Sequence, residues 1–147
     1  MLGIQTGGTG IAHPGYSGIY EDIRMYEISI TSDFSAAHSL RDYEGKCANV
    51  HGHNWRVRVT VRAEETAPNG IAIDFKDLKR ITNEVLGRVD HTHMNEVAPF
   101  DKVNPTSENI ARWLCEQLDP ELRSSRVKLV RVDVQENENS CVSFFPD

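Results

Sequence analysis

The sequence has no long apolar run, no excess of positive charge and few cysteines. Its uninterrupted apolar stretches span only a few residues, which is too short to cross a bilayer. Sixteen basic and 22 acidic residues give a net charge of −6, whereas a nucleic-acid-binding domain of this size is usually basic. Three scattered cysteines, with no CxxC pair, do not make a disulfide scaffold. These absences predict a cytoplasmic globular protein with free thiols that binds neither membrane nor nucleic acid.

Glycine is concentrated at the start of the chain. Six of the ten glycines fall within residues 3–18, and no charged side chain occurs before Glu21. Such a segment cannot bury enough apolar surface to offset the entropy lost on ordering, and it lacks the basic and apolar regions of a secretory signal. We therefore expect a flexible tail over residues 1–23. The remaining residues, 24–147, have a length typical of a single domain with one core.

Apolar residues recur with strand and helix periods after the tail. Alternation with period 2 predicts half-buried strands, and spacings of three and four residues predict helices. In chain order, the predicted elements are strands at 26–31 and 51–62, helices at 75–85 and 105–118, and strands at 127–136 and 141–145, with an irregular segment at 88–105. Strands grouped around two helices indicate an α+β fold with an antiparallel sheet.

Three histidines are placed to converge at one end of the predicted sheet. His51 and His53 are two residues apart on a strand, so their imidazoles point to the same side. His38 follows the first predicted strand and neighbours this pair if the two strands form a hairpin. Three converging imidazoles make a Zn²⁺ site that keeps one coordination position open, as catalytic zinc sites do. A chance His-x-His pair at a strand end is an equally open interpretation of the pattern.

Two further groups are candidates for proton transfer. Cys47 lies four residues before His51, and a bound dication nearby would increase its thiolate fraction, although a lone cysteine is more often a small buried hydrophobe. Asp90 and His91 form a candidate acid–base couple, since a carboxylate can hold an imidazole in one tautomer. Adjacent side chains point apart in an extended chain. The couple therefore needs a tight turn, or each group serves a different partner.

Polar residues at the ends of two predicted elements are candidate ligand contacts. Glu136 continues the alternating valines of 130–134, and a carboxylate that extends an apolar face must find donors or a cation. It could accept two N–H bonds from a guanidine-like edge, or the strand could end at Val134 and leave it in solvent. Thr106 and Ser107 fit a helix start, whose exposed N–H groups could also hold a ligand.

Six short motifs follow one another along residues 25–147. They are FSAAH (34–38), CANVHGHN (47–54), DF (74–75), DH (90–91), PTSEN (105–109) and VQE (134–136). Each motif alone is modest, but their order is highly specific. Together they resemble the 6-pyruvoyltetrahydropterin synthase / 6-carboxytetrahydropterin synthase family.

The resemblance implies a role for each candidate residue. The zinc ligands would be His38, His51 and His53. The catalytic base would be Cys47, with Asp90 and His91 as its catalytic partners. Glu136 would anchor the amino-pyrimidine edge of a pterin, and Thr106 and Ser107 would add contacts.

The resemblance also implies the tunnelling fold, or T-fold. In that fold two hairpins form a sheet with two helices on one face, and copies of the chain assemble into a barrel. The expected partners are therefore a small-molecule pterin and further copies in a homo-oligomer, a hexamer or similar, with active sites between subunits. Two positions depart from the family pattern: Met94 replaces the usual Leu, a tolerable apolar change, and Asn137 replaces the usual Thr and offers no hydroxyl there.

The spacing between Cys47 and His51 separates branches of the family. Pyruvoyl-forming members usually have a longer stretch there, whereas three residues intervene here, as in the carboxy-forming branch of queuosine biosynthesis. A folate-linked branch uses a Glu in place of the cysteine, and the retained Cys47 argues against it. We therefore expect a zinc-dependent lyase that converts 7,8-dihydroneopterin triphosphate to 6-carboxy-5,6,7,8-tetrahydropterin, triphosphate and acetaldehyde. The alternatives are 6-pyruvoyltetrahydropterin synthase activity and a non-catalytic metal- or pterin-binding protein, which would need neither Cys47 nor the couple at 90–91.

Overall fold

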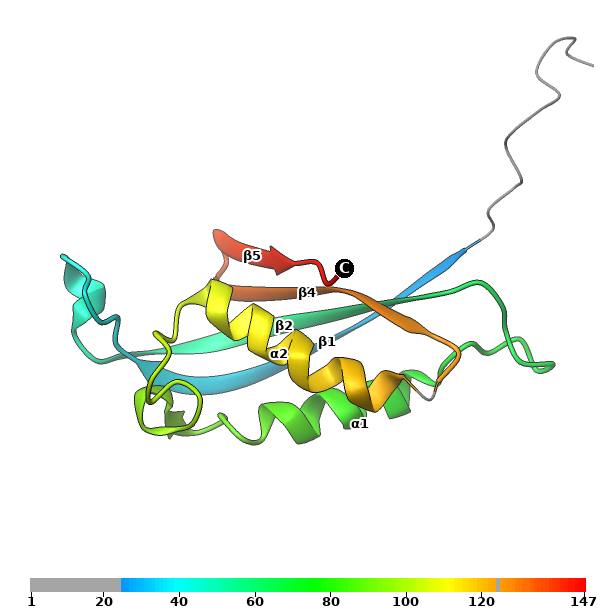
Figure 1. Ribbon diagram of the computed structural model, residues 1–147, viewed down its shortest axis with the longest axis horizontal. Helices are drawn as coiled ribbons and strands as arrows, with labels where there is room; N and C mark the ends of the chain where they lie inside the picture. Colours follow the sequence, from blue (N-terminus) through cyan, green and yellow to red (C-terminus); the bar gives the residue numbers. More distant parts are fainter. Residues whose placement is uncertain (1–24, 124) are drawn as a thin grey trace, which may run out of the picture.

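The structure, a computed structural model, describes residues 25–123 and 125–147, so the tail predicted over 1–23 lies outside the described residues. In this part of the chain, five strands form one sheet in the order β3-β1-β2-β4-β5, and α1 and α2 lie on the same side of it (Figure 1). The elements are β1 (Tyr26–His38), η1 (Lys46–Ala48), β2 (His51–Ala63), α1 (Phe75–Leu86), β3 (Thr92–His93), η2 (Met94–Glu96), α2 (Ser107–Leu122), β4 (Lys128–Asn137) and β5 (Ser140–Phe144). The predicted α+β fold with two helices on one face is confirmed.

Two antiparallel hairpins make up most of the sheet. β1 pairs with β2 along the whole length of both strands, with Ile30 opposite Val59 and His38 opposite His51. β4 and β5 form the second hairpin, and β4 joins it to β2 with Val134 opposite Val57. This topology places the start of β2 and the end of β1 at the same end of the sheet.

The core lies between the sheet and the two helices. Residues of one parity in β2, from Trp55 to Val61, are fully buried, and the arginines between them are exposed, as the period-2 pattern predicts. Leu78 of α1 and Leu114 of α2 are also fully buried, and each such side chain contributes about 1.5–3 kcal/mol. Within the described residues, neither helix is both long and apolar enough to cross a membrane.

The segment 88–105, predicted to be irregular, contains a short strand and a 3-10 turn. β3 pairs in parallel with β1, with Thr92 opposite Ala36. Directly before β3, the backbone N–H of His91 donates to the carbonyl of Ser35 in β1 at 2.6 Å. A strand of two residues is too short to show an alternating pattern. The sheet, which the sequence predicts to be antiparallel, is therefore mixed, with one short parallel pairing at this edge.

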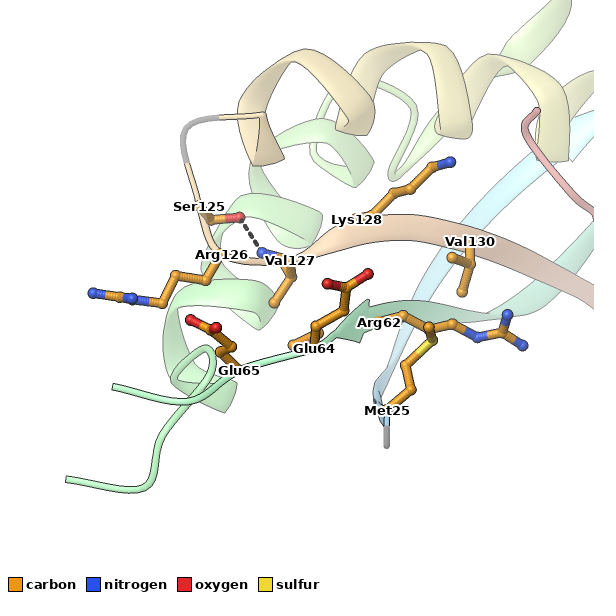
Figure 2. Close-up of a pocket in the computed structure, with 10 residues that line it drawn as sticks. Met25, Arg62, Glu64, Glu65, Ser125, Arg126, Val127, Lys128 and Val130 are labelled. Atoms are coloured by element: carbon orange, nitrogen blue, oxygen red, sulfur yellow. Dashed lines mark hydrogen bonds between the residues drawn. The ribbon is translucent and has the colours of Figure 1, made fainter. Parts of the chain in front are cut away.

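β4 has one extra residue, Val130, where its pairing with β2 shifts register. Leu129 and Val132, on either side, are buried in the core, whereas Val130 is only half-buried. Val130 lines a cavity of about 640 Å³ with Met25 and Arg62, at the end of the sheet where β2 finishes (Figure 2). The prediction that Val130 shares the buried face of Val132 is wrong, because a bulge reverses the alternation and the adjacent apolar residues Leu129 and Val130 do not reveal it.

Candidate metal centre and active site

The three predicted histidine ligands meet at one end of the β1–β2 hairpin. His38 ends β1 opposite His51, the first residue of β2, and His53 follows on the same face. The ring centroids are 4.5 Å apart for His38 and His51, 5.2 Å for His38 and His53, and 4.8 Å for His51 and His53. The buried ring of Trp55 packs edge-on against His38 and His53. We call His38, His51 and His53 the histidine cluster.

Backbone carbonyls orient two rings of the histidine cluster. The Nδ1 of His38 lies 2.7 Å from the carbonyl oxygen of Pro105, and the Nδ1 of His51 lies 2.7 Å from that of Asn49. A carbonyl oxygen only accepts hydrogen bonds, so each Nδ1 carries the hydrogen and each Nε2 keeps a free lone pair. Among the described residues, the buried Nε2 atoms of His38 and His53 have no hydrogen-bond partner. Such atoms are costly to bury, and binding a metal ion removes that cost, so the cluster fits a metal.

Burial lowers the pKa of His38 and of His53 below that of an ordinary imidazole. Loss of hydration is the main cause for both rings, and the neighbouring imidazole of His51 adds to it. The carboxylate of Glu136 acts in the opposite direction on the pKa of both rings. The net effect favours the neutral ring near pH 7, which is the form that binds a metal ion.

Glu136 lies beside the histidine cluster. Its Oε1 is 3.3 Å from the Nε2 of His53, close enough for an ion pair but not aligned as a hydrogen bond. The candidate ligand atoms of the cluster and of Glu136 all lie within 4.8 Å of one another. The family resemblance implies a pterin contact for Glu136, and the sequence pattern misses this proximity to the histidine cluster. The available signal was the pairing of the apolar strands β2 and β4, since Val134 opposite Val57 brings Glu136 toward His53.

Thr106 and Ser107 connect the start of α2 to this region. The Oγ1 of Thr106 accepts a hydrogen bond from the backbone N–H of Asn109 at 3.2 Å, so the predicted helix cap is confirmed. The hydroxyl of Ser107 donates to Oε2 of Glu136 at 3.1 Å. Pro105 directly precedes Thr106, and its carbonyl oxygen contacts the ring of His38. The start of α2 therefore lies against the histidine cluster.

Cys47 lies between the two strands that carry the histidine cluster. It is the middle residue of η1, in the loop that joins the end of β1 to the start of β2. This loop extends beyond the sheet (Figure 1). The carbonyl of Cys47 accepts a hydrogen bond from the backbone N–H of Leu40 at 2.9 Å, and its thiol is free and partly exposed. This bond holds the backbone of Cys47 next to Leu40, which is two residues after His38.

Asp90 and His91 interact through a tight turn, which satisfies the condition set by their adjacency in the sequence. His91 has a positive φ of 56°, and its Nδ1 lies 2.9 Å from Oδ1 of Asp90. That same oxygen accepts a hydrogen bond from the backbone N–H of Ser35 at 2.8 Å. This bond is the main reason that the pKa of Asp90 is lowered, with a smaller contribution from His91. The carboxylate is therefore held ionised and aligned on the imidazole.

Within one chain, this couple and the histidine cluster occupy opposite faces of the sheet. The histidine cluster shares the face of the buried Trp55. His91, whose side chain is 81% exposed, lines a hollow of about 400 Å³ together with Gly52 and Asn54, which face away from the helices. His53 also borders this hollow, but its ring packs against Trp55 on the helix side. The hollow is open at Gly52, where an added Cβ would meet only the carbonyl oxygen of Ala36, at 3.8 Å. The structure thus brings the predicted metal ligands and Glu136 together but leaves the Asp90–His91 couple apart from them.

Comparisons with known proteins identify the family of the chain. A family model described as 6-pyruvoyl tetrahydropterin synthase matches residues 27–147. A putative 6-carboxy-5,6,7,8-tetrahydropterin synthase of Archaeoglobus fulgidus is 44% identical over 112 residues, which cover 76% of this chain and 89% of the relative. Dihydroneopterin monophosphate aldolase of Pyrococcus furiosus is 33% identical over 105 residues, which cover 71% and 84%.

A solved structure shows the same fold. The 6-pyruvoyl tetrahydropterin synthase of Caenorhabditis elegans superposes with a TM-score of 0.75 and 28% identity, over 85% of this chain and 98% of that one. The family model spans the described elements from β1 to β5, so the resemblance carried by the six motifs is confirmed. The chain has the T-fold and belongs to the 6-pyruvoyl tetrahydropterin synthase family, a family of pterin enzymes.

Proposed function

We propose that the protein is a zinc-dependent lyase of queuosine biosynthesis. It converts 7,8-dihydroneopterin triphosphate and one water molecule to 6-carboxy-5,6,7,8-tetrahydropterin and releases triphosphate and acetaldehyde. The observation that carries the proposal is the histidine cluster with its free Nε2 atoms, adjoined by the loop that bears Cys47. The short spacing from Cys47 to His51 and the name of the Archaeoglobus fulgidus relative favour the carboxy-forming reaction over the pyruvoyl-forming one.

The histidine cluster would hold the zinc ion. Three neutral imidazoles suit Zn²⁺, and the two backbone carbonyls that accept from Nδ1 fix the rings of His38 and His51 in the ligating tautomer. When bound, zinc supplies Lewis-acid polarisation of the side-chain oxygens of the substrate. With Glu136 kept for the pterin, the three histidines would leave the metal accessible to these oxygens.

Glu136 would bind the amino-pyrimidine edge of the pterin. An ionised carboxylate only accepts hydrogen bonds, and its two oxygens match two N–H groups on a guanidine-like edge. Ser107 donates to Oε2 and so orients the carboxylate. Thr106 and Ser107 lie at the start of α2, next to Glu136, where they would add contacts to the pterin ring.

Proton transfer would fall to Cys47 and the Asp90–His91 couple. The Cys47 thiolate would take the C1′ proton of the substrate, and His91 would pass protons with Asp90 holding its ring. Asp90 is fixed by the backbone of Ser35, so the couple is a rigid donor–acceptor pair at the edge of the sheet. Because the couple and the histidine cluster lie on opposite faces, the couple of one copy would serve the metal centre of another.

A homo-oligomer, a hexamer or similar, would form these shared sites. β3 covers only the end of β1, with Ala36 and Ala37 paired, so in the described residues the rest of that edge has no strand partner. β5 forms the opposite edge. Open edges favour pairing with a further strand, and edge-to-edge pairing of copies closes a barrel.

One experiment tests the reaction. Zinc-loaded protein is incubated with 7,8-dihydroneopterin triphosphate, and the products are identified by mass spectrometry. Carboxypterin with acetaldehyde is the expected result. A pyruvoylpterin product would indicate 6-pyruvoyl tetrahydropterin synthase activity, as the Caenorhabditis elegans structure is named. Turnover of 7,8-dihydroneopterin monophosphate alone would indicate the aldolase activity for which the Pyrococcus furiosus relative is named. No turnover of either substrate by metal-loaded protein would favour a non-catalytic binding protein.

A further inference from the structure

Two asparagine side chains bind the backbone that follows β1. The Oδ1 of Asn95 accepts from the backbone N–H of Ser39 at 2.8 Å, and its Nδ2 donates to the carbonyl of Ser39 at 2.9 Å. Asn104 does the same for Arg41, at 2.9 Å and 3.1 Å. Each amide reproduces the N–H and C=O of a strand residue. Both asparagines therefore continue the sheet edge beyond β3 with side chains in place of backbone.

The guanidinium of Arg41 organises the loop between these asparagines. It donates to four backbone carbonyls, at distances from 2.8 to 3.4 Å, namely those of Phe100, Val103, Asp101 and Asn95. A guanidinium has five N–H donors in a rigid fork and is suited to such convergent carbonyls. We call Arg41, Asn95 and Asn104 the clamp.

The clamp is joined to the candidate metal centre on both sides. Ser39 directly follows His38, and Pro105 directly follows Asn104. The carbonyl of Pro105 accepts the Nδ1 hydrogen of His38 at 2.7 Å. Leu40, between the two clamped residues, donates its backbone N–H to the carbonyl of Cys47 at 2.9 Å. Fixing residues 39–41 against residues 95–104 thus fixes His38 against the acceptor of its ring hydrogen.

His38 needs such a link more than His51 does. The acceptor for His51 is the carbonyl of Asn49, two residues away on the same chain segment. The acceptor for His38 is 67 residues away in the sequence, so only tertiary contacts hold it in place. The two asparagines of the clamp supply four side-chain-to-backbone bonds at this point.

We propose that the clamp is a positioning device for the metal ligand His38. Its side chains do not belong to the group of candidate ligands. They hold the carbonyl of Pro105 where it keeps hydrogen on Nδ1 and the lone pair on Nε2. The proposal rests on the proposed metal site. Loss of the clamp should weaken metal binding through His38 alone and leave the contribution of His51 and His53 unchanged.

The test is the Zn²⁺ affinity of the full chain, measured by competition with a chromophoric chelator. Asn104→Ala should weaken binding by about 10- to 100-fold, the usual effect of removing the support of a metal ligand. Asn104→Asp keeps the acceptor for the N–H of Arg41 and should lose less. Asn139→Ala, in the exposed turn between β4 and β5, is the matched control and should bind as the wild type does.

A double-mutant cycle with His38→Ala distinguishes positioning from general damage. When His38 is absent, Asn104→Ala should cause no further loss of affinity, because its effect passes through that ligand. An equal loss in both backgrounds would overturn the proposal, as would unchanged affinity of the folded Asn104→Ala protein. If circular dichroism shows that Asn104→Ala does not fold, Arg41→Lys, which keeps the charge but not the fork, enters the same cycle. Failure of the wild-type protein to bind Zn²⁺ would instead refute the proposed function.

Discussion

Replacing Glu136 by glutamine separates the two roles open to this carboxylate. As a pterin anchor it accepts two N–H bonds from the substrate, whereas as a fourth metal ligand it closes the coordination shell. E136Q keeps the size of the side chain and an acceptor for the hydroxyl of Ser107, which now donates to Oε2 at 3.1 Å. It removes the charge and one acceptor. A hydrogen bond to a charged group is worth about 1.5–3 kcal/mol, so its loss should raise KM by about 10- to 150-fold.

Metal affinity decides between the two roles. With the histidine cluster intact, we expect the Zn²⁺ affinity of E136Q to fall by less than about tenfold, since three ligands suffice for a catalytic zinc site. Chelator competition gives the affinity, and steady-state kinetics with 7,8-dihydroneopterin triphosphate gives KM and kcat. Glu138→Gln, an exposed carboxylate in the β4–β5 turn, is the control. A loss of affinity beyond about 100-fold with unchanged KM would show that Glu136 is a ligand and refute the open site.

Three other predictions concern the same site. Alanine at any position of the histidine cluster should remove stoichiometric metal, measured by elemental analysis. His93→Ala should retain it, because His93 lies outside the candidate ligand group and its Nδ1 is 3.3 Å from Oε1 of Glu96. Cys47→Ala should keep metal and fold but lose about 100- to 10,000-fold in kcat, with Cys141→Ala, an exposed free cysteine, as the unaffected control; metal lost along with the thiol would make Cys47 a ligand. Inactive Cys47→Ala and His91→Ala subunits, dissociated and reassociated together, should recover part of the activity. If mixed oligomers are verified by native mass spectrometry but have no activity, each site is built within one chain.

The regular parts of the fold could be predicted because their periods are long enough to read. β2 alternates over thirteen residues, and the inner residues from Trp55 to Val61 face the helices as expected. β3 could not be predicted, since two residues carry no period. The bulge at Val130 could not be predicted either, because the adjacent residues Leu129 and Val130 are both apolar and either could face the core. Sequence patterns reveal periodicity, and both features interrupt it.

The candidate site divides in the same way. The histidine cluster was predictable, since His51 and His53 share a strand face and a hairpin places His38 opposite. The backbone groups that orient the candidate side chains were not predictable. The carbonyl of Pro105 orients His38, and the backbone N–H of Ser35 orients Asp90. Because nearly every residue carries such backbone groups, no side-chain pattern marks them. The sequence therefore predicts the candidate residues but not the backbone groups that hold them.

The separation of the two half-sites is the reason that we propose an assembly. The histidine cluster faces the helices, and the ring of His38 is buried beside Trp55. The Asp90–His91 couple is fixed to the edge of β1 by the backbone of Ser35 and cannot swing around the sheet without breaking that bond. Within the described residues, a single chain therefore holds the candidate metal ligands on one face of the sheet and the couple on the other. In the proposed assembly, pairing of the β1 and β5 edges between copies would set the couple of one chain at the border of the next, so that the contacts that protect the edges would also complete the site.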